Sequence, residues 1–301
     1  MLVTTCEIMK KAQEGHYAIG AFNVENMEMV QAVLAAAEET HSPVIMQTTP
    51  STVKYAGLDY YLANVATAAA RANVPVVMHL DHGSSFELAM QALRAGYTSI
   101  MIDGSKLSLE DNIALTKSVV AACSPSGVPV EAEIGTIGGK EDGMSGKPVY
   151  TEPADAKKFV DGCGMNSLAV AIGTAHGIYK GIPKLDVERL SEIRAVVDIP
   201  LVLHGTSGVP DDQVRDCVSR GICKVNYATD LRIAYTNGVR KFLSENRDAF
   251  DPKKYGAAGR ELAGVIADIN DRKPTWKLIG LLDDDSGLQL GRLPDALHRA
   301  Q

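Results

Sequence analysis

The sequence lacks clustered cysteines, basic runs and long apolar stretches, and each absence excludes a class of protein. Its five cysteines are scattered and form no CxxC motif: Cys6, Cys123, Cys163, Cys217 and Cys223. An odd, unpatterned set of thiols is typical of a reduced protein, so we expect a cytoplasmic location. The first residues, MLVTTCEIMKK, lack a basic segment followed by an apolar core, and we therefore expect no signal peptide.

Charge and hydropathy narrow the range of partners. The net charge is −7, from 30 basic and 37 acidic residues, and no Lys/Arg run is longer than a pair. Nucleic acid binding depends on clustered basic residues, so we expect no nucleic acid partner. No apolar run approaches the ~18 residues of a spanning helix, so we expect no membrane partner. An anionic substrate stays open, because a local pocket can oppose the global charge.

What the sequence does contain is a regular alternation of strand-like and helix-like segments. Amphipathic stretches such as 27–40 and 86–96 separate most of eight short apolar runs, at 18–22, 43–47, 75–80, 99–102, 129–134, 167–172, 200–204 and 223–227. Eight such units without a composition break predict a single-domain α/β fold, the (β/α)8 TIM barrel. An open doubly wound sheet is the alternative fold, which the number of units disfavours. The absence of G-x-G-x-x-G after the first run disfavours a dinucleotide-binding fold.

The two ends of the chain lie outside this repeat. Thr4 and Glu7 form a capping-box pattern, which predicts a short helix that Gly15 ends. We place the barrel at residues 1–272 and a C-terminal tail of uncertain order at residues 273–301, since the tail is rich in Gly, Asp and Pro.

Histidines mark the ends of three predicted strands. His82, His176 and His204 each precede a glycine, and the sequence has only seven histidines. In a (β/α)8 barrel the loops after the strands meet at one mouth, where the chemistry takes place. Three imidazoles and an open position are typical of catalytic zinc. A single histidine at a strand end is more often a hydrogen-bonded core residue, and for His79 that interpretation stands beside a functional one.

Carboxylates accompany these histidines. Asp81, beside His82, can act as a general acid/base, or it can cap the following helix. Asp103, Glu131 and Glu133 at the next strand ends can fill the barrel as salt bridges, support the histidines, or hold a second divalent or monovalent cation.

The loops after the sixth to eighth strands are rich in Gly, Ser and Thr. Their sequences are HGIYKG, HGTSG and NYATD. Barrel phosphate sites commonly use the last of these loops, whose backbone N–H groups and hydroxyls face the ligand. Ordinary turns use the same residue types, but beside a metal site they favour a phosphorylated substrate. The candidate substrate-binding residues are Gly177, Lys180, Gly205, Thr206, Ser207, Asn226, Tyr227, Ala228 and Thr229.

With these motifs the sequence resembles the class II, metal-dependent ketose-bisphosphate aldolases. The resemblance runs from about residue 3 to about 270, through AFNVEN, HLDHG, MIDGS, VEAEIGTIGGKEDG, AVAIGTAHGIYKG, LVLHGTSGVPD and KVNYATDLR. It implies reversible aldol cleavage of a ketose 1,6-bisphosphate to dihydroxyacetone phosphate and glyceraldehyde 3-phosphate, with a homodimer or homotetramer.

The resemblance also implies roles for individual residues. His82, His176 and His204 would hold the catalytic Zn²⁺, with Asp103 and Glu133 matching positions for a second cation. Asp81 would exchange the C4 hydroxyl proton, and Glu141 the proton of the enediolate. Gly177, Gly205, Ser207, Asn226 and Thr229 match contacts to the dihydroxyacetone phosphate half. A Schiff-base lysine is the chemical alternative, but no lysine stands at the sixth strand's end, and Lys224 lies near the start of the eighth.

Two residues depart from the family pattern. Lys140 stands where some members carry an acidic residue, which disfavours a second cation there. Ala228 resembles tagatose-type rather than fructose-type members, although TDLR immediately after it resembles the latter. We expect tagatose 1,6-bisphosphate as substrate, with fructose 1,6-bisphosphate the close alternative. A non-catalytic sugar-phosphate-binding or stabilising subunit and a zinc hydrolase are competing functions.

Overall fold

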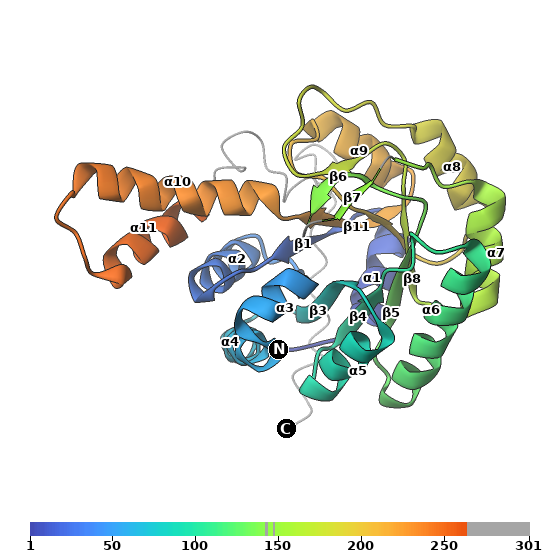
Figure 1. Cartoon of the computed structure of the whole chain (residues 1–301), viewed down its shortest axis with the longest axis horizontal. Helices are drawn as coiled ribbons and strands as arrows, with labels where there is room; N and C mark the ends of the chain where they lie inside the picture. The colour runs from blue at the N-terminus through green and yellow to red at the C-terminus, as the bar shows by residue number, and fades with distance from the viewer. Residues whose placement is uncertain (142–143, 147, 264–301) are drawn as a thin grey trace.

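Eight parallel strands close into a barrel in the computed structural model, which confirms the predicted fold (Figure 1). The structure describes residues 1–141, 144–146 and 148–263, without the side chains of residues 140–147 and 262. Around the barrel the strands follow the order β1 (Ile19–Asn23), β11 (Ile222–Tyr227), β10 (Leu201–Leu203), β8 (Ser167–Val170), β5 (Val130–Ile134), β4 (Ser99–Ile102), β3 (Val76–Gly83) and β2 (Val44–Thr48). Each of the eight predicted runs overlaps one of these strands.

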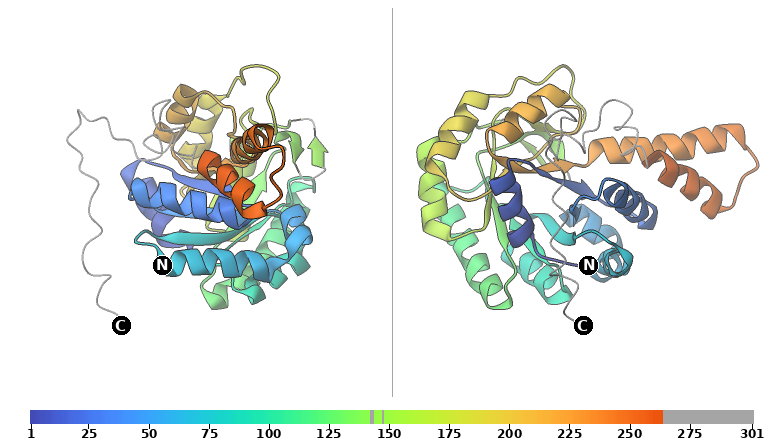
Figure 2. Two further views of the ribbon diagram at one scale, coloured as in Figure 1. Left: turned by 90° about the vertical axis from the view of Figure 1, so that its left-hand side faces the viewer. Right: turned by 180° about the vertical axis from the view of Figure 1, so that it is seen from behind.

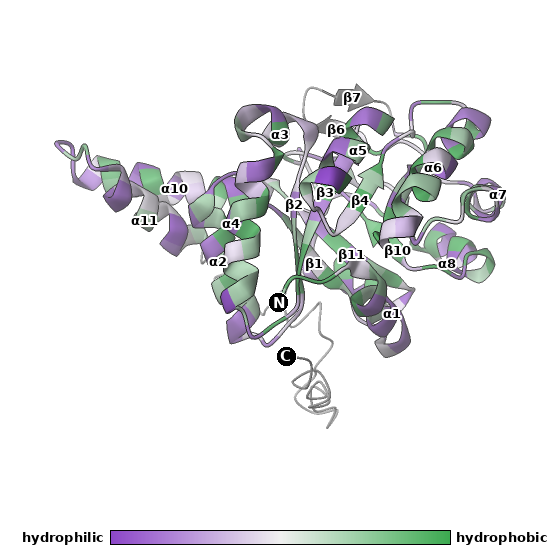
Figure 3. Cartoon of the chain, turned by 90° about the horizontal axis from the view of Figure 1, so that it is seen from below, coloured by the Kyte–Doolittle hydropathy of each residue, from purple (hydrophilic) through white to green (hydrophobic). Residues whose placement is uncertain are grey.

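Helices follow the strands, and all but the last two cover the barrel from outside (Figures 1 and 3). They are α2 (Met27–Glu39), α3 (Pro50–Ala56), α4 (Leu58–Arg71), α5 (Phe86–Ala95), α6 (Leu109–Cys123) with the short η1 (Ser124–Ser126), α7 (Pro153–Cys163), α8 (Val187–Val196), α9 (Asp211–Ser219), α10 (Thr229–Glu245) and α11 (Pro252–Ala263). Two of the predicted helices, 27–40 and 86–96, match α2 and α5 closely. No helix in this described part of the chain is both long and apolar enough to cross a bilayer.

The last two helices extend away from the barrel as a hairpin (Figure 2). Their backbones approach closely, because a side chain at Gly238 in α10 would lie 2.3 Å from the carbonyl oxygen of Ala258 in α11. Glycine is therefore required at this crossing. The predicted domain boundary at residue 272 and the tail 273–301 lie outside the described residues.

The first helix, α1 (Thr5–Gly15), begins after Thr4 as predicted. The predicted capping box is wrong, however, because the Thr4 side chain makes no capping hydrogen bond. The Glu7 carboxylate instead accepts from Lys11 Nζ at 2.8 Å, one helical turn further on. The helix therefore begins at the predicted position without that pair of side-chain bonds.

The interior of the barrel changes from apolar to polar along the strands. At the amino-terminal end, Ile8, Met9 and Ala12 of α1 pack against an apolar layer of strand residues, which comprises Ile19, Ala21, Ile45, Val77, Ala169, Val202 and Cys223. Alternate residues point inward along a strand, so β3 continues from Val77 to the buried polar residues His79 and Asp81. The polar layer at the carboxyl ends of the strands positions the site.

A small second sheet lies beside this end of the barrel. Its strand order is β7 (Met144–Gly146), β6 (Gly138–Glu141) and β9 (Ala175–His176). Parallel pairing of β6 with β9 places Gly139 opposite His176. A side chain at Gly139 would lie 2.1 Å from the His176 carbonyl oxygen, so glycine allows the loop after β5 to reach this histidine.

Candidate metal centre and active site

The structure brings the three predicted histidines together. They come from the end of β3, from β9 and from the residue after β10, and one nitrogen from each lies within 4.8 Å of the others. His82 Nε2 is 2.9 Å from His204 Nδ1. The ring of His176 stands edge-on to that of His82, with centroids 5.1 Å apart. The three imidazoles therefore face one point.

A local break in β3 turns His82 into the barrel. Strict alternation would place Asp81 and His82 on opposite faces. The pairing of β3 with β4 shifts register between Leu80 and Gly83, and His82 adopts the left-handed conformation, with φ of 48°. Gly83 makes this possible, since a side chain there would lie 2.3 Å from the carbonyl oxygen of Met101. Such strain in a non-glycine residue persists where the surroundings enforce it, often at functional sites.

Carboxylates behind the histidines select which nitrogen faces the centre. Asp103 Oδ2 lies 2.8 Å from His82 Nδ1, and Glu131 Oε1 lies 3.0 Å from His204 Nε2. An ionised carboxylate only accepts hydrogen bonds, so each of these nitrogens carries the proton. The opposite nitrogens, His82 Nε2 and His204 Nδ1, therefore face each other, and without metal the protonated His82 Nε2 can donate to the lone pair of His204 Nδ1. Supporting carboxylates of this kind are usual behind metal-ligating histidines.

The electrostatics of the cluster keep two of the imidazoles neutral. Burial, followed by the charge of His82, lowers the pKa of His176 to about 3 and that of His204 well below its usual value. Burial opposes a charge on His82 as well, but Asp81 and Asp103 outweigh it and raise the pKa of His82 well above its usual value. Neutral imidazole is the form that binds metals.

Glu133 shows that the residues fit a cation. Its Oε2 atom is buried without a hydrogen-bond partner among the described residues, and it lies 3.6 Å from His204 Nδ1. Burial, with Asp103 nearby, raises the pKa of Glu133 well above its usual value. A buried carboxylate oxygen without a partner is costly, and a cation among the imidazoles would satisfy it. His82, Asp103 and Glu133 also form a second group with metal-binding spacing.

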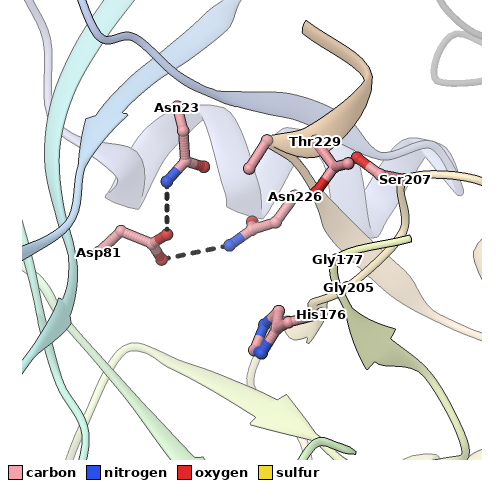
Figure 4. A pocket seen from close by; sticks show the side chains of 9 residues that line it. Asn23, Asp81, His176, Gly177, Gly205, Ser207, Asn226 and Thr229 are labelled. Carbon is pink, nitrogen blue, oxygen red and sulfur yellow. Dashed lines mark hydrogen bonds between the residues drawn. The ribbon is translucent and has the colours of Figure 1, made fainter. Parts of the chain in front are cut away.

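Asp81 is held by three amides beside the histidines, and Figure 4 shows two of them, Asn23 and Asn226. Asn23 Nδ2 and Gln47 Nε2 both donate to Asp81 Oδ2 at 3.2 Å, while Asn226 Nδ2 donates to Oδ1 at 3.2 Å. The carboxylate is 2% exposed. It is therefore fixed in position by side chains from three neighbouring strands, β1, β2 and β11.

Sequence reasoning missed Asn23 and Gln47. The available signal was a buried amide at the end of each of two otherwise apolar strands. Gln47 Nε2 also donates to Asn23 Oδ1 at 2.8 Å, which orients the pair toward Asp81. Buried polar side chains are hydrogen-bonded as a rule, and these bonds lead to the candidate acid/base.

A pocket of about 270 Å³ opens above this cluster. It is lined by Asn23, Asp81, His176, Gly177, Gly205, Ser207, Asn226, Ala228 and Thr229, most of which Figure 4 labels. Lys180 lines an adjoining pocket of about 720 Å³, which shares Gly177, Ser207 and Thr229 with the first. Seven of the nine predicted substrate-binding residues therefore line these two pockets.

Thr206 and Tyr227 do not line either pocket. The Thr206 hydroxyl is buried and donates to the carbonyl oxygen of Leu203 at 3.2 Å. Tyr227 points out of the barrel and stacks on Phe22, with ring centroids 5.8 Å apart. Both side chains are therefore used in packing around the site rather than at its surface.

Lys224 contacts Glu131, the carboxylate behind His204. The sequence predicts Lys224 near the start of its strand, away from the mouth, and it is the third residue of β11. Its side chain nevertheless reaches toward the site, because the buried Nζ bonds both oxygens of Glu131 at 3.0 Å. Lys224 is therefore connected to His204 through a single residue, Glu131. Lys140 and Glu141 end β6, and their side chains are outside the described residues.

Comparison with known proteins agrees with this geometry. The family model for fructose-bisphosphate aldolase class-II matches residues 3–269. The YdjI aldolase from Escherichia coli K12 is 37% identical, with a TM-score of 0.78 over 89% of this chain and 97% of that one. A putative fructose-1,6-bisphosphate aldolase from Coccidioides immitis is 33% identical, with a TM-score of 0.77 over 88% and 94% of the two chains. Fructose-bisphosphate aldolase from Campylobacter jejuni is 25% identical, with a TM-score of 0.76 over 90% and 95%.

Proposed function

This chain belongs to the class II fructose-bisphosphate aldolase family and is a lyase, and we propose that it cleaves a ketose 1,6-bisphosphate in a zinc-dependent reaction. The products are dihydroxyacetone phosphate and glyceraldehyde 3-phosphate, and the reverse condensation uses the same groups. The observation that carries the proposal is the meeting of three imidazole nitrogens, one from each histidine, beside the pocket that contains Asp81.

His82, His176 and His204 would hold the zinc ion. His176 and His204 are already neutral, and His82 would give up its proton on binding. When bound, zinc supplies a Lewis acid that stabilises the negative charge developing on the C2 oxygen of the substrate. Asp103 and Glu131 accept hydrogen bonds from the outer nitrogens of His82 and His204, so that the other nitrogen of each ring faces the ion. A second cation beside Asp103 and Glu133 is part of the proposal, and the unpartnered Glu133 oxygen supports it.

Asp81 takes the proton of the C4 hydroxyl as the C3–C4 bond breaks. The bonding electrons pass to C3 and give the enediolate of dihydroxyacetone phosphate, while C4 becomes the aldehyde carbon. Glu141 then delivers a proton to the enediolate carbon. A fixed acid/base contributes roughly 10²–10⁴-fold to such a step, and the amides of Asn23, Gln47 and Asn226 fix Asp81.

The dihydroxyacetone phosphate half fits the glycine-rich side of the pocket. Gly177 and Gly205 both have positive φ, at 89° and 64°, so that their backbone N–H groups can line the pocket without side chains. Ser207 and Thr229 add hydroxyl groups, and Lys180 in the adjoining pocket adds a positive charge. Thr206 and Tyr227 support this surface from behind.

Ala228 supports tagatose 1,6-bisphosphate as the preferred epimer. Its methyl group lines the pocket next to Asn226 and Thr229 and can form no hydrogen bond to a substrate hydroxyl. The test is cleavage of tagatose and fructose 1,6-bisphosphates side by side by zinc-reconstituted protein, with coupled detection of triose phosphate. Asp81→Ala is the control for contaminating aldolase.

A tagatose preference supports the full proposal, and a fructose preference overturns only the choice of epimer. Cleavage of neither by zinc-loaded protein overturns the bisphosphate assignment. We further propose a cytoplasmic homodimer or homotetramer, as the resemblance to the family implies, and light scattering of the purified protein tests the assembly.

A further inference from the structure

A charged pair lies inside the barrel, directly beneath the three histidines. Lys224 from β11 is fully buried and Glu131 from β5 is 2% exposed. Lys224 Nζ lies 3.0 Å from both carboxylate oxygens of Glu131. Two full charges removed from water need each other, and such pairs often contribute no more to stability than apolar residues of similar size. Stability alone therefore does not account for this pair.

Glu131 connects the pair to the histidines. Its Oε1 atom accepts from His204 Nε2 at 3.0 Å while bonding to Lys224, and the Ser167 hydroxyl makes a longer contact of 3.5 Å to Oε2. This bond to Glu131 is what leaves His204 Nδ1 facing His82 Nε2. The rotation of the His204 ring and its choice of proton-bearing nitrogen depend on where Glu131 is held.

Lys224 is the group that holds it there. Its other neighbour is His79, whose Nε2 lies 3.4 Å from Nζ and whose Nδ1 bonds the Ser99 hydroxyl at 2.8 Å. Burial and the charge of Lys224 lower the pKa of His79 well below its usual value, so this ring is neutral. Among the described residues, Lys224 is therefore the basic side chain that forms a salt bridge with Glu131 at hydrogen-bonding distance while His79 stays neutral.

We propose that Lys224 is a positioning residue for the metal centre, which acts through Glu131 to keep His204 Nδ1 aimed at the ion. The inference rests on the proposed function for the presence of zinc. It adds Lys224 behind Glu131, which itself stands behind the ligand His204. Lys224 touches neither metal nor substrate. Its ammonium orients the carboxylate, and the carboxylate orients the imidazole.

The test compares zinc affinity across three variants of the full chain, by competition with a chromogenic chelator. Lys224→Met removes the cation. Lys224→Met/Glu131→Gln removes both charges but keeps an amide oxygen that can accept from His204 Nε2. Ser99→Ala is the matched control, because it removes buried bonds to His79 and Thr5 in the same layer without touching Glu131.

We expect roughly 10–100-fold weaker zinc binding in Lys224→Met, the usual consequence of losing a group that supports a metal ligand. The double variant should melt near the parent's temperature without metal and still bind zinc about tenfold more weakly, since an amide accepts less strongly than a carboxylate. Ser99→Ala should lower the melting temperature and leave zinc affinity within about twofold. The visible spectrum of Co²⁺-loaded protein should change in both Lys224 variants and stay unchanged in the control.

Parent-like zinc affinity and an unchanged Co²⁺ spectrum in the double variant would overturn the inference, even if Lys224→Met did not fold. Equal losses of affinity in Ser99→Ala would also overturn it, since the effect would then follow stability alone. If the parent binds no zinc, the proposed function itself fails. The two failures are therefore distinguishable.

Discussion

His82 Nε2 lies 2.9 Å from His204 Nδ1, although 122 residues separate the two histidines in the sequence. The two rings present different nitrogens because different carboxylates stand behind them, Asp103 behind His82 and Glu131 behind His204. The imidazoles are thus oriented before any ion arrives. Preorganisation of this kind removes the cost of ordering the ligands at the moment of binding.

Removing one histidine should abolish both metal binding and cleavage. We expect His204→Ala to copurify with less than about a tenth of the parent's zinc and to lose at least about 10³-fold in kcat, since two imidazoles bind zinc far less tightly than three. Elemental analysis and the coupled cleavage assay measure the two effects. His41→Ala, at an exposed histidine, is the control. Full zinc content in His204→Ala would contradict the assigned ligand set.

Changing the acid/base should separate chemistry from metal binding. Asp81→Asn keeps the shape of the side chain but replaces the proton acceptor, so we expect kcat to fall by roughly 10²–10⁴-fold. Zinc content should stay at the parent's level. A variant that loses zinc in parallel with activity would mean that Asp81 supports the metal centre rather than proton transfer.

Gln47 should matter for rate although it does not line the pocket. Gln47→Met removes the donor to Asp81 and the donor to Asn23 together, so we expect kcat to fall about tenfold with KM changed less than about threefold. Gln47→Glu is the informative companion, because its carboxylate would face Asp81 and repel it. A purely structural role would lower the melting temperature of Gln47→Met without changing kcat.

Zinc affinity should rise with pH between about 6 and 8. Burial opposes a charge on His82, but Asp81 and Asp103 hold its pKa well above the usual value, so the metal-free protein carries a proton there that zinc must displace. Titration calorimetry in buffers of different ionisation enthalpy should show about one proton released per zinc at pH 7. Zinc affinity independent of pH over this range would contradict the prediction.

The same proton affects the stability of the metal-free protein. A folded pKa above the unfolded value means that the contribution of His82 is fully present below about pH 6.5 and is lost as the pH rises through its folded pKa. The melting temperature without zinc should therefore fall on the alkaline side. Asp103→Asn, which removes a cause of the raised pKa, should flatten this slope.

The epimer preference should respond to a single position. Ala228→Asp introduces a hydrogen-bonding carboxylate into the pocket wall, and we expect the ratio of kcat/KM for fructose over tagatose 1,6-bisphosphate to rise about tenfold, or roughly 1.4 kcal/mol. Ala228→Ser is the milder comparison. An unchanged ratio in Ala228→Asp would place the determinant of the epimer elsewhere in the pocket.

The periodicity of the sequence determined the barrel. Eight apolar runs separated by amphipathic segments can bury both faces of every strand only when the sheet closes inside a ring of helices, and polar residues after a strand then meet at one mouth. This reasoning located His82, His176 and His204, together with Asp81 and the glycine-rich loops. It also led to the resemblance that the comparisons support.

Only the tertiary structure decided how these residues act together. The register shift and left-handed backbone at His82 are set by contact of Gly83 with β4, which no local pattern reveals. The roles of Asn23, Gln47 and Lys224 depend on which strands are neighbours in the closed barrel and which side chains share a layer inside it. Short-range sequence predicts most of the inward-facing residues, although not His82, and the partners of a buried charge are set by the packing of strands far apart in the chain.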